Sequence, residues 1–416
     1  MRPTEQITEQ LLRSPEMKMR SPRTLSRRRF LEAMAAGLGM AVLSHEGVRA
    51  LEEINKNTEF VYSQQNKEIL LNLLNKSDTI DPHFGVVADP RRSASETIAR
   101  LSEVRKGVGQ LAHVGYFTKI EDLLSWQGTN EFLTTLKMID GQDAVPFIAL
   151  GGGNPIDGHH MLAPESSAQL EGYLENVVKV LRQYGKPVVI RFLFEMNTYN
   201  FGYSRNQLGI SDVDQIRGFQ RAVKSIDTLL KKYDIRQDVK LMFNPTCWQP
   251  FTQYASDKKA LACFDLFGLD LYDFSLFKGV YIGKTLLPPG KVSPFEVMHG
   301  SMKELHNIAS KKEVMIGEFG SFGQDVQWMQ QMVLLLLANN VNTISYFDSD
   351  ERPKHELFEG DFRITPEMMM VFRKIFTLIQ TFQNKPLTRE NLDTIQSCLL
   401  HLRIPLSLND ICSLHV

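Results

Sequence analysis

The sequence predicts an α/β protein built as one (β/α)8 TIM barrel, and three observations support this fold class. Eight short apolar runs recur along the chain, each of the kind that a parallel sheet buries on both faces. A helical pattern follows each run, as in a barrel of alternating strands and helices. The alternative, an open doubly wound sheet, is expected to carry a glycine-rich phosphate loop after its first strand, and "VVADPRRS" has none.

The predicted strands are, in chain order, 83–89, 110–117, 144–152, 187–195, 239–245, 264–272, 313–320 and 342–348. Helix starts between them are marked by a serine three residues before an acid, the capping-box pattern or its aspartate variant, in 93–96, 211–214 and 293–296. Pro294 takes the first helical position of the third, and "TPE" at 365–367 opens the last helix. Two connections, 198–210 and 273–292, are long and follow strand ends, so we expect them to form walls of a substrate cleft.

The domain organisation predicted from the sequence places a single barrel at 82–385, after an export signal. Residues 1–50 contain "SRRRFLEAMAAGLGMAVL", which resembles a twin-arginine signal peptide, and a helical lead-in is expected at 51–81. The apolar part of the signal spans about a dozen residues, too few for a stable membrane span. We therefore expect export by the twin-arginine translocase to a bacterial periplasm or beyond; a basic amphipathic helix is the alternative. Residues 386–416 form an extension of unknown role.

Composition narrows the class of function. The formal net charge of -1 gives no global case for nucleic acid as a partner. The four cysteines match no metal-ligand spacing and are either free thiols or members of accessory disulfides. We predict no metal and no cofactor.

Two predicted strands end in a glutamate, Glu195 in "RFLFEMN" and Glu318 in "IGEFGS". With a period of two, Arg191, Leu193 and Glu195 are expected to share one strand face, as are Val314, Ile316 and Glu318. Two carboxylates that face each other across a barrel mouth are what glycosidic cleavage requires, provided that one stays protonated. The alternative for Glu195 is an internal ion pair with Arg191.

Three motifs, "IRFLFEMN", "GLDLY" and "IGEFGS", resemble strands four, six and seven of glycoside hydrolase family 26, the β-mannanase family of the retaining (β/α)8 clan. The resemblance implies that Glu195 is the acid/base, Glu318 the nucleophile and Arg191 a support on strand four. It also implies that Tyr272 donates a hydrogen bond to the nucleophile. Phe194 departs from the family, which has histidine immediately before the acid/base. An apolar neighbour favours a raised pKa at Glu195.

Four further residues are predicted to contact a poly- or oligosaccharide substrate: Asn197, Trp248, His160 and Phe347. Trp248 has the flat ring that stacks on sugars, although a core position is the alternative, and Trp126 is a weaker candidate of the same kind. His160 lies in the glycine-rich loop 151–161, where a metal site or a phosphate cradle is less favoured than sugar contacts.

The sequence thus predicts an exported retaining glycoside hydrolase that acts on a β-mannan-like or related glycan. Two alternatives stay open. One is a catalytically inactive carbohydrate-binding barrel, which Phe194 makes plausible. The other is a metal-dependent barrel hydrolase that uses the 151–161 loop.

Overall fold

The structure is a computed structural model, and its described residues are 65–76, 80–89, 94–152, 155–156, 158–198, 203, 209–247, 249–272, 281–282, 285–286, 293–321, 325–349, 363–383, 387–407, 410–411 and 414. The predicted export signal lies outside these residues. Of the lead-in, residues 65–75 are helical.

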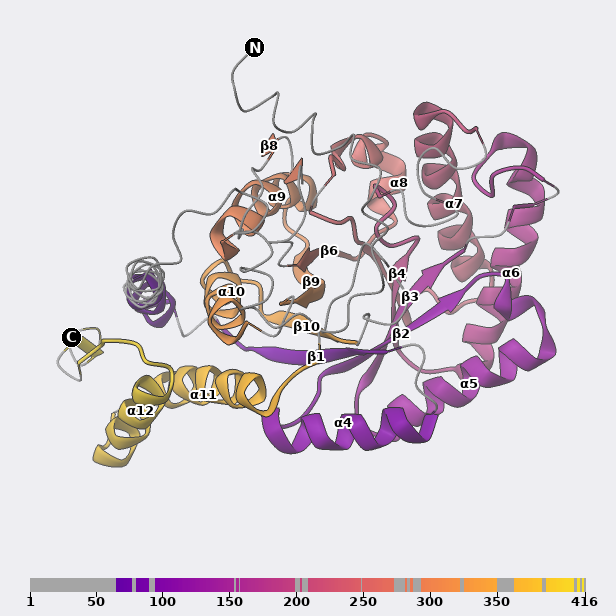
Figure 1. Ribbon diagram of the computed structural model, residues 1–416. Helices are drawn as coiled ribbons and strands as arrows, with labels where there is room; N and C mark the ends of the chain where they lie inside the picture. Colours follow the sequence, from indigo (N-terminus) through magenta and orange to yellow (C-terminus); the bar gives the residue numbers. More distant parts are fainter. Residues whose placement is uncertain are drawn as a thin grey trace, which may run out of the picture. The chain divides into compact units, whose positions relative to one another are not determined.

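Eight parallel strands close into a barrel in the order β1-β10-β9-β6-β5-β4-β3-β2, which confirms the predicted fold class (Figure 1). All eight predicted strands are present. Their bounds are β1 His83–Ala88, β2 His113–Lys119, β3 Val145–Gly151, β4 Val188–Phe192, β5 Val239–Phe243, β6 Leu266–Tyr272, β9 Glu313–Gly320 and β10 Thr343–Asp348. A short antiparallel pair, β7 Tyr281–Ile282 and β8 Thr285–Leu286, lies within the long connection after β6.

Helices follow the strands and surround them. Their bounds are α4 Ala94–Val108, α5 Trp126–Asp140, α6 Ser167–Tyr184, α7 Asp212–Lys232, α8 Lys258–Ala262, α9 Pro294–Ala309, α10 Val326–Ala338, α11 Pro366–Gln383 and α12 Arg389–His401, with 3-10 turns η2 Asp122–Leu124, η3 Pro164–Ser166 and η4 Thr252–Ala255. The predicted caps are confirmed at α7, where the Ser211 side chain accepts from Asp214 N, and at α9, where Ser293 and Glu296 form a reciprocal capping box.

Apolar side chains form two separate clusters. The larger one lies between the sheet and the helices. The smaller one fills the barrel and contains Val87, Phe147, Met242, Leu266 and Met315 below Tyr272 and Phe347. The barrel interior is therefore packed with side chains rather than open, as expected for eight strands, and polar chemistry is left to the strand ends.

The two glutamates reach the mouth by routes that the simple strand period did not predict. β4 ends at Phe192, and Leu193 (φ 48°) and Glu195 (φ 50°) lie in a turn with left-handed backbone. Leu193 packs in the outer cluster, so the predicted shared face with Arg191 and Glu195 is wrong. A left-handed conformation is strained for a residue other than glycine, and such strain is typical of functional sites.

On β9 a bulge at Gly317 changes which face of the strand the following side chains occupy. The register against β6 pairs Leu269 with Ile316 and then Asp270 with Glu318, so one residue of β9 is extra. Ile316 belongs to the outer cluster, while Glu318 points into the barrel, which corrects the predicted common face of these two residues. A side chain at Gly317 would collide with Asn244 and Asp270, so the bulge requires glycine.

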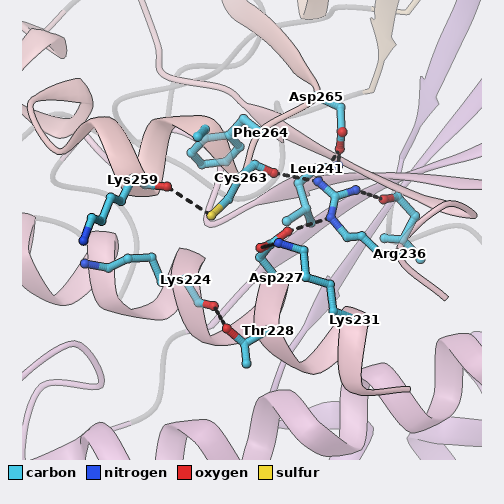
Figure 2. A network of polar contacts seen from close by, with 12 residues as sticks. Lys224, Asp227, Thr228, Lys231, Arg236, Leu241, Lys259, Cys263, Phe264 and Asp265 are labelled. Atoms are coloured by element: carbon cyan, nitrogen blue, oxygen red, sulfur yellow. Dashed lines mark hydrogen bonds and ion pairs between the residues drawn. The ribbon is translucent and has the colours of Figure 1, made fainter. Parts of the chain in front are cut away.

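A polar network away from the mouth fixes the loops that lead into β5 and β6 (Figure 2). Arg236 binds Asp227 of α7 at 2.6 Å and Asp265, the residue before β6, at 2.9 Å. It also donates to the carbonyls of Val239 and Cys263. One guanidinium thus joins the end of α7 to the starts of two neighbouring strands.

The C-terminal extension contains α12, whose buried residues Ile395, Cys398 and Leu399 anchor it. Gln330 of α10 donates to the Leu402 carbonyl at 3.0 Å. Among the described residues, no helix has the length and apolar character needed to cross a membrane. Cys247, Cys263 and Cys398 are free thiols, and Cys412 lies outside the described part of the chain.

Candidate active site

Arg191 is the centre of the site at the mouth of the barrel. It is fully buried on β4, and its three guanidinium nitrogens donate to side chains on or just after three different strands. Nε donates to Asn244 Oδ1 after β5 at 2.7 Å, and one terminal nitrogen donates to Asp270 Oδ2 on β6 at 2.6 Å. The other forms an ion pair with Glu318 Oε1 on β9. Burial alone would lower the pKa of Arg191, but the charges of Asp270 and Glu318 raise it above its ordinary value.

Glu318 is held at both of its oxygens. Arg191 donates to Oε1, and the Tyr272 hydroxyl, from the end of β6, donates to Oε2. A carboxylate that accepts at both oxygens has a fixed orientation. Burial and the charge of Glu318 raise the pKa of Tyr272 well above 10, so the phenol stays a donor. The hydrogen bond predicted between Tyr272 and Glu318 is therefore present.

Glu195 lies two residues beyond the end of β4, where its backbone N–H donates to the Asn244 carbonyl at 2.6 Å. Its side chain is buried, and no Lys or Arg among the described residues forms an ion pair with it. Burial first, and then the negative charges of Asp270 and Glu318, raise the pKa of Glu195 well above its ordinary value. Arg191 instead pairs with Asp270 and Glu318, so the predicted alternative of an Arg191–Glu195 ion pair is wrong.

Asp270 is a third carboxyl group in the site, and sequence reasoning missed it. It is fully buried on β6, two residues before Tyr272 on the same strand face. Burial raises its pKa to about 7, with Arg191 opposing and Glu318 adding to the shift. Asn244 was missed as well. The signal that could have revealed both is Arg191 itself, because a buried guanidinium needs several polar partners on the neighbouring strands.

Phe194, the departure from the family pattern, covers this network. Its ring centroid lies 5.0 Å from Arg191 Cζ, and Phe147 lies 5.4 Å from the same atom on the barrel side. Phe194 also contacts Phe117 at 5.6 Å, and Phe117 contacts Phe347 at 6.2 Å. Aromatic rings therefore shield the guanidinium from water, which strengthens its interaction with the carboxylates.

The other predicted substrate contacts have different surroundings. Asn197 is fully buried; its amide donates to the carbonyls of Thr246 and Gln249 and accepts from Thr246 N. These bonds position the β5 connection and leave the amide little capacity for a sugar. Phe347 lies beside Tyr272, with ring centroids 5.8 Å apart. His160 is 2% exposed, and its Nδ1 accepts from Leu162 N at 3.1 Å.

Trp248, together with Asn154 and Asp157 of the 151–161 loop, lies outside the described residues. Within the described part of the chain, no group of three or more His, Cys, Asp or Glu side chains is arranged to hold a metal ion.

Comparison with known proteins shows similarity in fold at low sequence identity. No protein-family model and no curated protein matches the chain. Among solved structures, the exo-β-1,4-mannosidase Op5Man5 from Opitutaceae bacterium strain TAV5 has a TM-score of 0.51 and 12% identity, over 77% of this chain and 60% of that chain. Mannanase BCman from Bacillus subtilis has a TM-score of 0.45 and 14% identity, over 73% of this chain and 90% of that chain. GH26A from a Muricauda species has a TM-score of 0.44 and 13% identity, over 68% of this chain and 88% of that chain.

The similarity to Op5Man5 agrees with the barrel described above. A family 26 enzyme and a mannanase are among the similar structures.

Proposed function

We propose that this protein is an exported retaining glycoside hydrolase that cleaves β-glycosidic bonds of a β-mannan-like polysaccharide, with Glu195 as acid/base and Glu318 as nucleophile. The observation that carries the proposal is the contrast between two buried carboxyl groups at one barrel mouth. Glu318 accepts hydrogen bonds at both oxygens from Arg191 and Tyr272, whereas burial raises the pKa of Glu195 so that it retains a proton. Such a pair supplies one nucleophile and one acid.

In the first step, a carboxylate oxygen of Glu318 attacks the anomeric carbon, and the bond to the leaving sugar breaks. Glu195 donates its proton to the departing oxygen at the same time, so that no free alkoxide forms. The product of this step is a glycosyl ester on Glu318. Its negative charge is lost, and Arg191 keeps the charge of Asp270 as its partner.

In the second step, Glu195 is ionised and takes a proton from water, whose oxygen attacks the anomeric carbon and releases Glu318. Asp270, together with Glu318 once it is released as a carboxylate, raises the proton affinity of Glu195, which favours its return to the protonated form. Each cycle thus restores both carboxyl groups to their starting states.

The test is hydrolysis of mannans, xylans and glucans by the purified protein, by Glu318→Ala and by Glu195→Ala. We expect both variants to lose turnover of polysaccharide by several orders of magnitude. Glu195→Ala should keep activity on aryl glycosides with a good leaving group, because that bond breaks without an acid. No turnover by the wild type on any of these glycans, together with measurable sugar binding, would favour the inactive carbohydrate-binding barrel.

Export by the twin-arginine route is tested separately with the double variant Arg27→Lys and Arg28→Lys. Wild-type protein should appear in the periplasmic fraction or the medium, and the variant should stay in the cytoplasm. Equal export of both would contradict the assignment of the signal.

A further inference from the structure

Several exposed apolar side chains of the described chain lie at the starts of helices. Eight large hydrophobic residues of the described chain are exposed, and four of them, Leu124, Trp126, Val213 and Phe295, lie at or just before the start of a helix that follows a strand. Helices of a (β/α)8 barrel start at the face that carries the active site. Trp126 and Phe295 are the two aromatic residues of the eight, and aromatic rings are the side chains that stack on sugars.

Trp126 is the first residue of α5 and is 83% exposed, next to Leu124, which is 40% exposed. The connection that carries them is tied to the mouth, because Ile120 N donates to the carbonyl of Gly151 at the end of β3 at 2.9 Å. The Ser125 side chain caps α5 by accepting from Gly128 N, which fixes the helix start that presents Trp126. The capped helix start therefore presents Trp126 to solvent at a fixed place.

Phe295 is the second residue of α9 and is 53% exposed. The capping box of Ser293 and Glu296 fixes this helix start. Ser301, six residues further on, donates to the Cys247 carbonyl at 3.1 Å, and Cys247 N in turn donates to the Asp270 carbonyl at 3.2 Å. The start of α9 is thus joined to the strand ends that carry the carboxyl groups.

The strand order places these two aromatic residues on opposite sides of the mouth. Trp126 follows β2 and Phe295 follows β6; three strands separate β2 from β6 on either side of the closed ring. Figure 1 shows α5 and α9 on opposite sides of the barrel accordingly. One of the two arcs contains β4, which leads to Glu195, and the other contains β9, which carries Glu318. A line from the start of α5 to the start of α9 therefore passes between the strands that lead to the two glutamates.

We propose that Trp126 and Phe295 are remote sugar-binding platforms at the two ends of one cleft, and that the occupant is an extended β-linked glycan several sugars long. This inference rests on the proposed function. A chain on this line exposes one glycosidic bond to Glu195 on one side and Glu318 on the other, as the two-carboxylate mechanism requires. Contacts on both sides of the cut bond make the enzyme endo-acting, since an exo-acting enzyme needs the chain on one side only.

The test compares a soluble β-1,4-mannan with an activated aryl β-mannoside, which is too short to reach either platform. We expect Trp126→Ala and Phe295→Ala each to lower kcat/KM on the mannan about three- to tenfold, as for the loss of one stacked aromatic contact, and to leave kcat/KM on the aryl mannoside unchanged. Val213→Ala is the matched control. Val213 is the second residue of α7, is 54% exposed and lies off the proposed line, so both rates should stay at the wild-type value.

The two possible failures can be told apart. Wild-type protein that cleaves both substrates, with Trp126→Ala and Phe295→Ala unchanged on mannan, overturns the cleft assignment and leaves the proposed function standing. Wild-type protein that cleaves neither substrate overturns the proposed function and this inference with it. The products give a second readout, because endo action lowers the viscosity of the mannan before free monosaccharide accumulates.

Discussion

Replacing Arg191 with methionine removes the cation on which the site is built. The variant loses the hydrogen bond to Asn244 at 2.7 Å and the contacts with Asp270 at 2.6 Å and with Glu318, while the side-chain volume is nearly kept. Both carboxylates are left buried without a positive partner. Removal of one member of a buried ion pair typically costs about 3–5 kcal/mol of unfolding free energy, and here two carboxylates lose the same partner, so we expect the upper end of that range.

The dependence on pH gives the sharper test. Burial already raises the pKa of Asp270 to about 7, and without Arg191, which opposes this shift, the pKa in the folded variant should rise further above its value in the unfolded chain. Between these values the folded state binds more protons, so the stability of the variant should fall as the pH rises from 5 to 8. Wild-type protein keeps the cation and should show a smaller decrease over this range.

The assay is urea unfolding at pH 5 and pH 8, with Arg236→Met as control. Arg236 binds two carboxylates outside the mouth, but Asp227 keeps Lys231 as a second partner and the site stays intact. The control should therefore be destabilised with little dependence on pH and with an unchanged kcat. A variant Arg191→Met within about 1 kcal/mol of wild type at both pH values would refute the account, since breaking a buried pair costs more than that.

Three further predictions concern single side chains. Tyr272→Phe removes a hydrogen bond to Glu318, and loss of about 1.5–3 kcal/mol should lower kcat roughly 10- to 150-fold; an unchanged kcat would exclude a role for the hydroxyl. Phe194→His replaces an apolar neighbour by a polar one, so the pKa of Glu195 should fall and the basic limb of the kcat/KM profile should move to lower pH; a fixed limb would show that Phe194 does not set it. Burial lowers the pKa of His113 to about 3. Below pH 6.5, His113 therefore binds a proton in the unfolded chain but stays neutral in the folded protein. Lowering the pH from 7 to 4.5 should then cost wild type roughly 2–3 kcal/mol more than His113→Gln by urea unfolding, and equal losses would contradict this.

The barrel was readable from the sequence because its strands are buried on both faces and each has a helix after it. Runs such as 144–152 and 313–320 have no polar face, a pattern that few other arrangements produce. Helix starts were readable at Ser211 and Ser293, because a side-chain cap is a local interaction. The end of β4 could not be read from the sequence, because the left-handed turn at Leu193 and Glu195 depends on tertiary contacts.

The candidate site was predictable only in part. Glu195 and Glu318 stand out because a carboxylate at the end of an apolar strand is unusual, and "GLDLY" indicated Tyr272 by resemblance. Asp270 lies inside a strand, where its cost of burial is offset by Arg191 from a strand 79 residues earlier. Asn197 looked like a cleft residue, yet its amide is bonded to the backbone of the β5 connection. Contacts between distant segments set the roles of both Asp270 and Asn197, and a single sequence does not show which distant segments meet.

The central claim, that Glu318 forms a glycosyl ester and Glu195 assists, is tested most directly by trapping that ester. Wild-type protein is incubated with an activated 2-deoxy-2-fluoro-β-mannoside, whose fluorine slows hydrolysis of the intermediate, and is then analysed by mass spectrometry of the intact protein and its peptides. The account predicts a mass increase of one fluorosugar on the peptide that contains Glu318, and no label on Glu318→Ala. A label on another residue, or cleavage of mannan by Glu318→Ala at the wild-type rate, would contradict it.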